Sequence, residues 1–189
     1  MSASTGSITA AQLPDGDVVA LLLEQHTRIR SLFGRVSAAQ GEERKHAFDD
    51  LRALLAVHEA AEELVIRPVA KKAAGQEEAD ARNAEEKEAG KVLKKLEGMD
   101  LSSSEFETTL AGFEQAVNDH ADHEEREEFP ALVAGCTVEQ RQTMGARLRR
   151  AEHLAPTHPH PGVAGNPTAM KLTGPFTAMM DKARDAIGR

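Results

Sequence analysis

Residues 54–68 read LLAVHEAAEELVIRP, and this stretch decides the fold. His58, Glu62 and Val65 recur at steps of three or four, so they share one face of an α-helix. That face is apolar except at the histidine and the glutamate. Burying an imidazole or a carboxylate costs roughly several kcal/mol unless the group is paired or binds a metal. Pro68 predicts a kink or an early end of this helix.

Three more stretches, residues 18–40, 77–97 and 104–130, carry the same helical spacing of apolar residues. Histidine or glutamate interrupts each apolar stripe. The interrupting residues are His26, Glu86, His120 and Glu124. The sequence has no alternating pattern typical of a strand, and short turns separate the four stretches. It therefore predicts an all-α protein, folded as an antiparallel up-and-down four-helix bundle.

The interrupting residues all lie at one height along the predicted bundle. His26 lies 15 residues before the predicted turn at Gly41, and His58 lies 17 residues after it. The other two turns give similarly matched separations. Because each helical residue rises about 1.5 Å, the polar residues meet within about one turn. The sequence thus predicts one cluster of six metal ligands, which are His26, His58, Glu62, Glu86, His120 and Glu124.

Two His-x-x-x-Glu pairs form the centre of this cluster, His58 with Glu62 and His120 with Glu124. A spacing of four puts both side chains of a pair on one helix face. Two such pairs on facing helices can supply terminal imidazoles to two ions and two carboxylates that bridge the ions. Imidazole and carboxylate ligands without thiolate suit iron, manganese or zinc. One pair occurs by chance, whereas two pairs in register indicate a metal site.

With these motifs the sequence resembles the bacterial hemerythrin-like proteins, the family with the HHE cation-binding domain. The matching residues are His26 in LLLEQHTRIRSLF, His58 and Glu62 in the stretch quoted above, and His120 and Glu124 in AVNDHADHEEREEFPAL. The resemblance covers roughly residues 18–133. It implies a non-haem di-iron centre with carboxylate and oxo or hydroxo bridges, which binds and turns over dioxygen, peroxide or nitric oxide. Turnover needs a reductant, which the sequence does not identify.

The third helix departs from the family pattern. Where the family usually has a histidine, the stretch NAEEKEAGKVLKKLE offers Glu86, and the phase of the apolar stripe favours Glu86 over Glu85. In the alternative, Glu85 or a water molecule takes this coordination position. A third carboxylate makes the ligand shell more anionic, which favours ferric iron. Reversible oxygen carriage is then less favoured than turnover of peroxide or nitric oxide.

Composition and charge exclude several other classes of protein. Lys and Arg number 23 against 31 Asp and Glu, so the net charge is −8, and we expect no nucleic acid or membrane partner. Cys136 is the only cysteine, which favours the reducing cytoplasm. No apolar run reaches the roughly 18 residues of a membrane span, and residues 1–16 lack the features of a signal peptide. Either a monomer or a dimer is compatible with the sequence.

The chain is expected to divide into three parts. Residues 1–14 are expected to be disordered, and residues 15–153 to form the bundle, which ends with a shorter helix over residues 138–153. Residues 154–189 are expected to form a linker rich in Pro and Gly, followed by a short helix that docks back onto the bundle.

Other polar residues are expected to be peripheral. His123 and Glu127 form a further His-x-x-x-Glu pair, with His123 off the stripe and Glu127 in phase with it, one turn beyond Glu124. We expect both to neighbour the site or to lie at the surface. The charged run HEEREE is expected to be a solvated face. Two other functions stay open: a non-catalytic module that senses or stores oxygen, nitric oxide or iron, and a structural bundle whose polar seam is only hydrogen-bonded.

Overall fold

The computed structural model describes residues 8–69, 76–153 and 176–188. Residues 8–14, inside the segment expected to be disordered, include a 3-10 turn at Ala10–Gln12. The expected linker falls on residues 154–175 and lies outside the described residues, as does the start of the chain.

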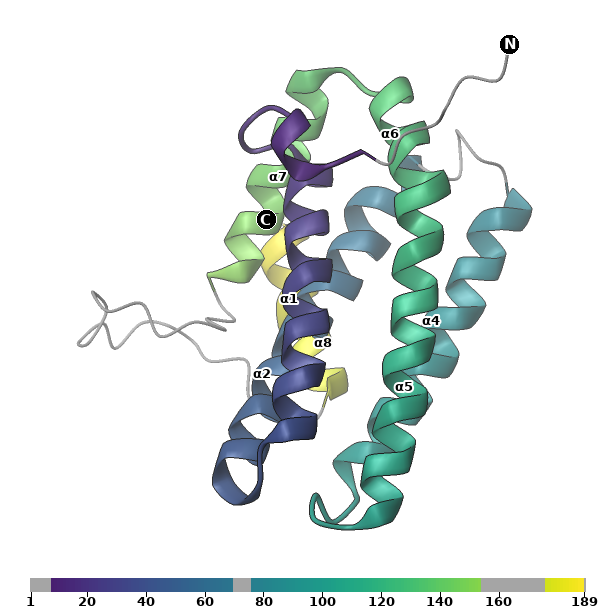
Figure 1. Ribbon diagram of the computed structural model, residues 1–189. Helices are drawn as coiled ribbons and strands as arrows, with labels where there is room; N and C mark the ends of the chain where they lie inside the picture. The colour runs from purple at the N-terminus through teal and green to yellow at the C-terminus, as the bar shows by residue number, and fades with distance from the viewer. Residues whose placement is uncertain (1–7, 70–75, 154–175, 189) are drawn as a thin grey trace, which may run out of the picture.

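Four long helices run alternately up and down, side by side (Figure 1). They are α1 (Val18–Ala38), α2 (Gly41–Ala61), α4 (Gln76–Glu97) and α5 (Ser104–His123). Asp17 caps α1 by accepting the N–H of Val19, and Ser103 caps α5 by accepting that of Phe106. The described ranges contain no strand. The predicted all-α antiparallel bundle is confirmed.

Both helices that carry a His-x-x-x-Glu pair widen into a π-helical turn just after the histidine. These turns are η2 (Glu62–Ile66) and η3 (Glu124–Glu128). Each turn is closed by a backbone hydrogen bond over five residues, from Arg67 to Glu62 and from Phe129 to Glu124. A glutamate of the predicted cluster therefore begins each π turn.

Proline explains where these wide turns lie. Pro68 and Pro130 each follow a π turn, at the same distance from its first glutamate. Proline lacks the N–H that an α-helix needs, and its ring clashes with the carbonyl four residues earlier. A wider turn accommodates both defects. Although the sequence places a proline at position 130, the helix does not end there, because the chain continues as α6 (Phe129–Gly135).

Two apolar clusters fill the interior, one on each side of the predicted polar level. Val18, Leu22, Phe129 and Leu132 belong to the cluster at one end of the bundle. The other cluster contains Ile29, Phe33, Leu51, Leu93, Phe106 and Phe113. His26 lies on α1 between Leu22 of the first cluster and Ile29 of the second. The polar residues thus form a layer between two hydrophobic cores.

Two further helices, α7 (Val138–Glu152) and α8 (Phe176–Gly188), flank the bundle. Helix α8 packs against α2 and α7 through Met179, Met180, Ala183 and Ile187, all of which are buried. An ion pair between Arg184 Nη2 and Glu63 Oε2, 2.7 Å apart, also joins α8 to the segment after α2. The chain therefore has the helical C-terminal extension that its spacing predicts.

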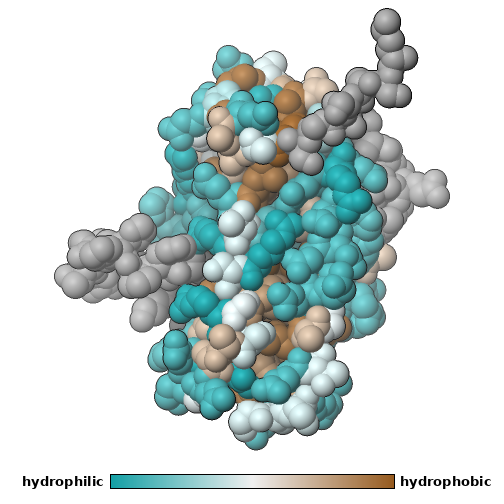
Figure 2. Space-filling view, viewed as in Figure 1, coloured by the Kyte–Doolittle hydropathy of each residue, from teal (hydrophilic) through white to brown (hydrophobic). Residues whose placement is uncertain are grey.

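The distribution of hydrophilic and hydrophobic residues on the surface is consistent with this packing. Hydrophilic residues cover most of the face shown in Figure 2, and hydrophobic residues are visible mainly at the upper end and along the middle. Among the helices that the structure describes, none has the length and apolar character needed to cross a membrane.

Candidate metal centre

Three imidazoles and two carboxylates converge in the polar layer, and five of the six predicted ligands are among them. His26 and His58 bring their Nε2 atoms to 3.2 Å from each other. His120 Nε2 lies 3.3 Å from Glu124 Oε1 and 3.8 Å from Glu62 Oε2. One donor atom from each of His26, His58, Glu62 and Glu124 fits within a group less than 4.8 Å across.

The spacing of these donor atoms fits a metal ion. His58 Nε2 lies 3.0 Å from Glu62 Oε1, and His26 Nε2 lies 3.4 Å from Glu124 Oε2. Ligands bound at about 2.0–2.2 Å to one ion lie about 3 Å apart when they are neighbours around it. The donors are therefore already arranged at about the separation that coordination requires.

The two carboxylates are the strongest indication that this cluster binds a cation. Glu62 and Glu124 are both fully buried. None of their four oxygen atoms accepts a hydrogen bond from any residue that the structure describes. A buried carboxylate without hydrogen bonds is costly unless a cation neutralises it. Three imidazoles beside two such carboxylates form a donor set typical of a protein metal site.

Each imidazole is held from behind through its Nδ1 atom. Glu125 Oε1 lies 2.8 Å from Nδ1 of His26, and Glu85 Oε2 lies 3.0 Å from Nδ1 of His120. Gln25 Oε1 lies 2.9 Å from Nδ1 of His58. Hydrogen bonds of this kind are usual around metal-binding histidines, where they fix the ring orientation and the position of the proton.

The contact to Gln25 fixes the tautomer of His58. The amide nitrogen of Gln25 donates a hydrogen bond to Glu152 Oε1 over 3.0 Å. Its amide oxygen must then accept from His58, so Nδ1 of His58 carries the proton. Nε2 is thereby left with its lone pair directed at the cluster, as a metal ligand requires.

In the metal-free protein, protons on the imidazoles compensate the negative charge of the buried carboxylates. Burial lowers the pKa of His26, but the carboxylates of Glu124 and Glu125 outweigh this effect and raise the pKa to about 9. Burial also opposes the charge on His120, and Glu124 with Glu62 raises its pKa to about 12. Burial acts to raise the pKa of Glu62, yet the neighbouring imidazoles hold it well below its usual value. Metal binding would displace these imidazole protons.

Further acidic residues surround the cluster. Glu128 is buried, with Oε1 3.3 Å from Nη1 of buried Arg67. Burial, and then the charge of Glu124, raise the pKa of Glu128 to about 7. Burial, and then the charge of Glu62, raise the pKa of Glu59 to about 8.

The side of the site that α4 forms is only partly described. Glu86 belongs to α4, but its side chain lies outside the described residues. Its neighbour Glu85 contacts the outer nitrogen of His120 rather than the nitrogen that faces the cluster. Glu85 thus orients a candidate ligand from outside the cluster.

The interpretation of HEEREE as a solvated face is wrong at Glu125 and Glu128. Glu125 contacts His26, and Glu128 is buried whereas Glu127 is exposed. Glu128 lies four residues after Glu124, a spacing that puts both side chains on one helix face. The rule that pairs His120 with Glu124 is therefore the sequence signal that could have revealed the burial of Glu128.

Gln25 and Arg67 were also missed as neighbours of the site. Gln25 precedes His26 directly, and a polar residue next to a candidate ligand gives no distinct periodic signal. Arg67 precedes Pro68 and is turned inward by the π turn at Glu62–Ile66. Gln25 and Arg67 lie beside the site only because the fold brings together helices that are distant in sequence.

Comparison with known proteins agrees with the site. A family model described as the hemerythrin HHE cation binding domain matches residues 17–132. An uncharacterized hemerythrin-like protein of Schizosaccharomyces pombe is 29% identical over 136 residues, which are 70% of this chain and 67% of that protein.

A solved structure shares the fold. It is a hemerythrin HHE cation binding domain-containing protein from Mycobacterium kansasii, with a TM-score of 0.65 and 23% identity. The match covers 88% of this chain and 98% of that one. With the domain match spanning α1 to α6, and with the imidazoles and carboxylates gathered between its helices, the chain belongs to the hemerythrin HHE cation-binding domain family.

Proposed function

We propose that this protein binds two iron ions and uses them to bind and turn over a small oxidant, which is dioxygen, peroxide or nitric oxide. The observation that carries the proposal is the placement of the two buried carboxylates. Glu62 directs Oε1 to His58 and Oε2 towards His120. Glu124 directs Oε2 to His26 and Oε1 to His120. Each carboxylate thus faces two separate groups of imidazoles, as a bridging ligand would.

The ligands would divide between two positions. His26 and His58 would hold one ion, while His120 and the proposed ligand Glu86 would hold the other. Glu62 and Glu124 would bridge the two ions. Imidazole and carboxylate donors without thiolate are compatible with iron, and a bound iron pair supplies one- and two-electron redox chemistry.

The protein's own residues would orient the ligands and restrict water. Gln25, Glu85 and Glu125 hold the outer nitrogens of the three imidazoles. Phe129 stacks on His26, with ring centroids 5.5 Å apart and an interplanar angle of 18°. A third carboxylate, from Glu86, would favour ferric iron, so we propose turnover of peroxide or nitric oxide rather than reversible oxygen carriage.

Metal analysis tests the proposal directly. Protein loaded with Fe(II) should contain two ions per chain, and its oxidised form should show the absorption bands of an oxo-bridged ferric pair. His120→Ala should lose one ion, and the neighbouring His123→Ala should keep both. Protein that takes up no iron and gains no thermal stability from Fe(II) would instead be a structural bundle.

Turnover requires a separate measurement. We expect the iron-loaded protein to accelerate the decay of added hydrogen peroxide or nitric oxide in the presence of a reductant, and His58→Ala to remove this acceleration. If the loaded protein binds these molecules without consuming them, it is a non-catalytic sensing or storage module.

A further inference from the structure

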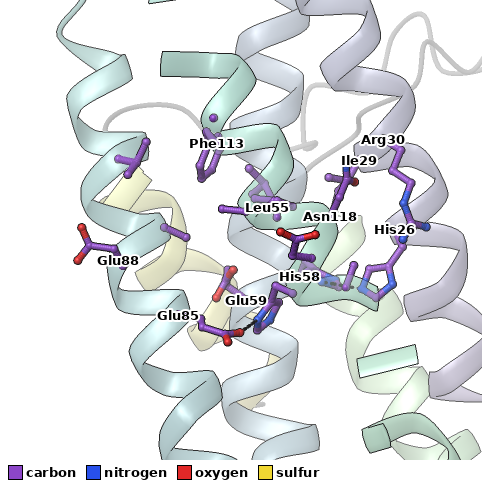
Figure 3. A pocket seen from close by; sticks show the side chains of 18 of the residues that line it. His26, Ile29, Arg30, Leu55, His58, Glu59, Glu85, Glu88, Phe113 and Asn118 are labelled. Carbon is purple, nitrogen blue, oxygen red and sulfur yellow. Dashed lines mark hydrogen bonds and ion pairs between the residues drawn. The ribbon is translucent and has the colours of Figure 1, made fainter. Parts of the chain in front are cut away.

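A cavity of about 590 Å³ adjoins the metal centre, between α1, α2, α4 and α5. His26, His58 and His120 line it at the centre. In the close view of Figure 3, Phe113 lies in the upper part, and Glu59 and Glu85 lie in the lower part. The cavity therefore has one polar end at the candidate centre and extends from it along the bundle.

The cavity is too large for the oxidants considered above. Dioxygen, nitric oxide and hydrogen peroxide each have two non-hydrogen atoms. An apolar cavity of about 150 Å³ holds a benzene molecule, so a cavity about four times larger has room for roughly 10–20 non-hydrogen atoms. Volumes of about 300–1,000 Å³ are usual for sites that bind organic molecules.

Most of the lining away from the centre is apolar. It includes Ile29, Leu55, Ala89, Val92, Phe113 and Val117. These side chains come from all four long helices, so they enclose the space from several sides. Exposed residues, Gly112 and Ala116 on α5, also line the cavity and mark a route from the surface. An apolar body would be removed from water on entering this space.

Lysine and arginine contribute little to the described lining of the cavity. Acidic residues that line it include Glu59, Glu85 and Asp119. Arg30 is the only lysine or arginine among the described lining residues, and it already pairs with Asp122 and Glu125. A carboxylate or phosphate on the guest would therefore find no unpaired lysine or arginine among the described lining residues. An uncharged apolar body fits the rest of the lining.

Two polar atoms of the lining residues lack a hydrogen-bond partner among the described residues, Nε2 of His120 and Oδ1 of Asn118. Nε2 of His120 faces Glu124 and Glu62 at the candidate centre. The polar end of the cavity is thus the end at this centre, and a guest with one O–H group would direct that group there.

We propose that this cavity binds a neutral organic molecule with an apolar chain or ring and one O–H end, namely an organic hydroperoxide and its product alcohol. The apolar body lies against Leu55, Phe113 and Val117, and the O–H end points to the histidines at the candidate centre. For the hydroperoxide the inference rests on the proposed function. Reduction breaks the O–O bond with two electrons and two protons, which an added dithiol supplies on closing to its cyclic disulfide, and yields the alcohol and water.

The chain offers a matched pair of variants for the test. Gly112 lines the cavity, and a Cβ added there meets no atom within 4 Å, so Gly112→Phe is the variant chosen to narrow the cavity. Its exposed neighbour Ala111 does not line the cavity, so Ala111→Phe is the control. Val117→Phe fills the space from within and serves as a second blocking variant.

Binding is measured by calorimetry with 2-phenylpropan-2-ol, and turnover with cumene hydroperoxide and hydrogen peroxide, using iron-loaded protein and dithiothreitol. The parent protein should bind the alcohol, and both blocking variants should weaken this binding at least tenfold. They should lower kcat/KM for cumene hydroperoxide at least tenfold and change that for hydrogen peroxide less than twofold. Ala111→Phe should change neither.

The outcomes separate this inference from the proposed function. If hydrogen peroxide is consumed but the alcohol does not bind, or binds equally to the blocking variants, the cavity assignment is overturned and the proposed function stands. If the alcohol binds as expected but neither peroxide is consumed, the cavity assignment stands for the alcohol, and both the proposed turnover and its hydroperoxide substrate fail.

Discussion

The Nε2 atoms of His26 and His58 face each other across 3.2 Å. Nδ1 of His58 must donate its proton to Gln25, and Nδ1 of His26 faces the carboxylate of Glu125. If both rings donate through Nδ1 and are neutral, two nitrogen lone pairs oppose each other. A proton or a metal ion between the carboxylates and these nitrogens relieves that repulsion. The pair therefore couples protonation, metal binding and stability.

The first prediction concerns the pH dependence of the metal-free protein. The pKa values of about 9 for His26 and about 12 for His120 lie above the ordinary histidine value, so their contribution to stability is complete below about pH 6.5 and is lost as pH rises towards these values. The raised pKa values of Glu128 and Glu59 act in the same direction. We expect Tm to fall between pH 6.5 and pH 9.

Iron loading provides the comparison for this measurement. Because metal ions would replace the imidazole protons, Tm of the loaded protein should fall less over the same pH range. Thermal unfolding of both forms, followed by circular dichroism, gives the result. A metal-free protein whose Tm is constant or rises with pH would show that protons do not compensate Glu62 and Glu124.

The second prediction concerns Gln25. Its replacement by leucine removes the acceptor that fixes the tautomer and orientation of His58. Loss of such an outer hydrogen bond typically lowers metal affinity about 10–100-fold. We expect Gln25→Leu to weaken iron binding by that amount in competition with a chelator, while exposed Glu24→Ala changes it little. Unchanged affinity in Gln25→Leu would mean that packing alone orients His58.

Helix spacing was sufficient to predict the bundle and the layer of polar residues within it. Apolar positions at steps of three and four identify the inward faces, and the matched distances of His26 and His58 from Gly41 place them at one level. These arguments use only the rise and period of a regular α-helix. They apply because α1 and α2 are regular up to the ligand positions.

The same arguments failed beyond Glu62 and Glu124, where the helices cease to be regular. There the π turn after Glu62 brings Arg67 inward, five residues after that glutamate, a spacing that a period of 3.6 residues places on another face. Partners such as Gln25 with His58 are separated by 33 residues, so their contact depends on how two helices are rotated against each other. A single sequence does not specify that rotation.

The third prediction separates Glu85 from Glu86. Glu85 contacts the outer nitrogen of His120, so Glu85→Ala should keep two ions per chain and weaken affinity about tenfold. Glu86→Ala should lose one ion, because it removes a proposed ligand. Glu86→His should keep both ions and raise the reduction potential, since a neutral ligand replaces an anionic one.

Metal content and redox titration of these variants decide the assignment on α4. If Glu86→Ala keeps both ions and an unchanged absorption spectrum, Glu86 is not a ligand. If Glu85→Ala instead loses an ion, the carboxylate of Glu85 turns to the metal on binding, and the contact with His120 belongs to the metal-free state.

The fourth prediction concerns the buried pair of Arg67 and Glu128, whose charged groups lie 3.3 Å apart beside the two bridging candidates. Arg67→Met leaves Glu128 in a buried site near Glu124. Removing one partner of a buried ion pair typically costs about 3–5 kcal/mol. We expect a loss of about 3 kcal/mol in the free energy of unfolding at pH 8.5, measured by urea denaturation of the metal-free protein.

The pH dependence of that loss identifies its cause. The pKa of Glu128 is already raised to about 7, and loss of the guanidinium would raise it further. At pH 6 the carboxyl group is then mostly neutral, so Arg67→Met should cost less than at pH 8.5. Arg184→Met, which removes a partly exposed pair with Glu63, should cost at most about 1 kcal/mol at both values. An equal cost of Arg67→Met at the two pH values would attribute the effect to lost packing of the arginine side chain rather than to an uncompensated charge.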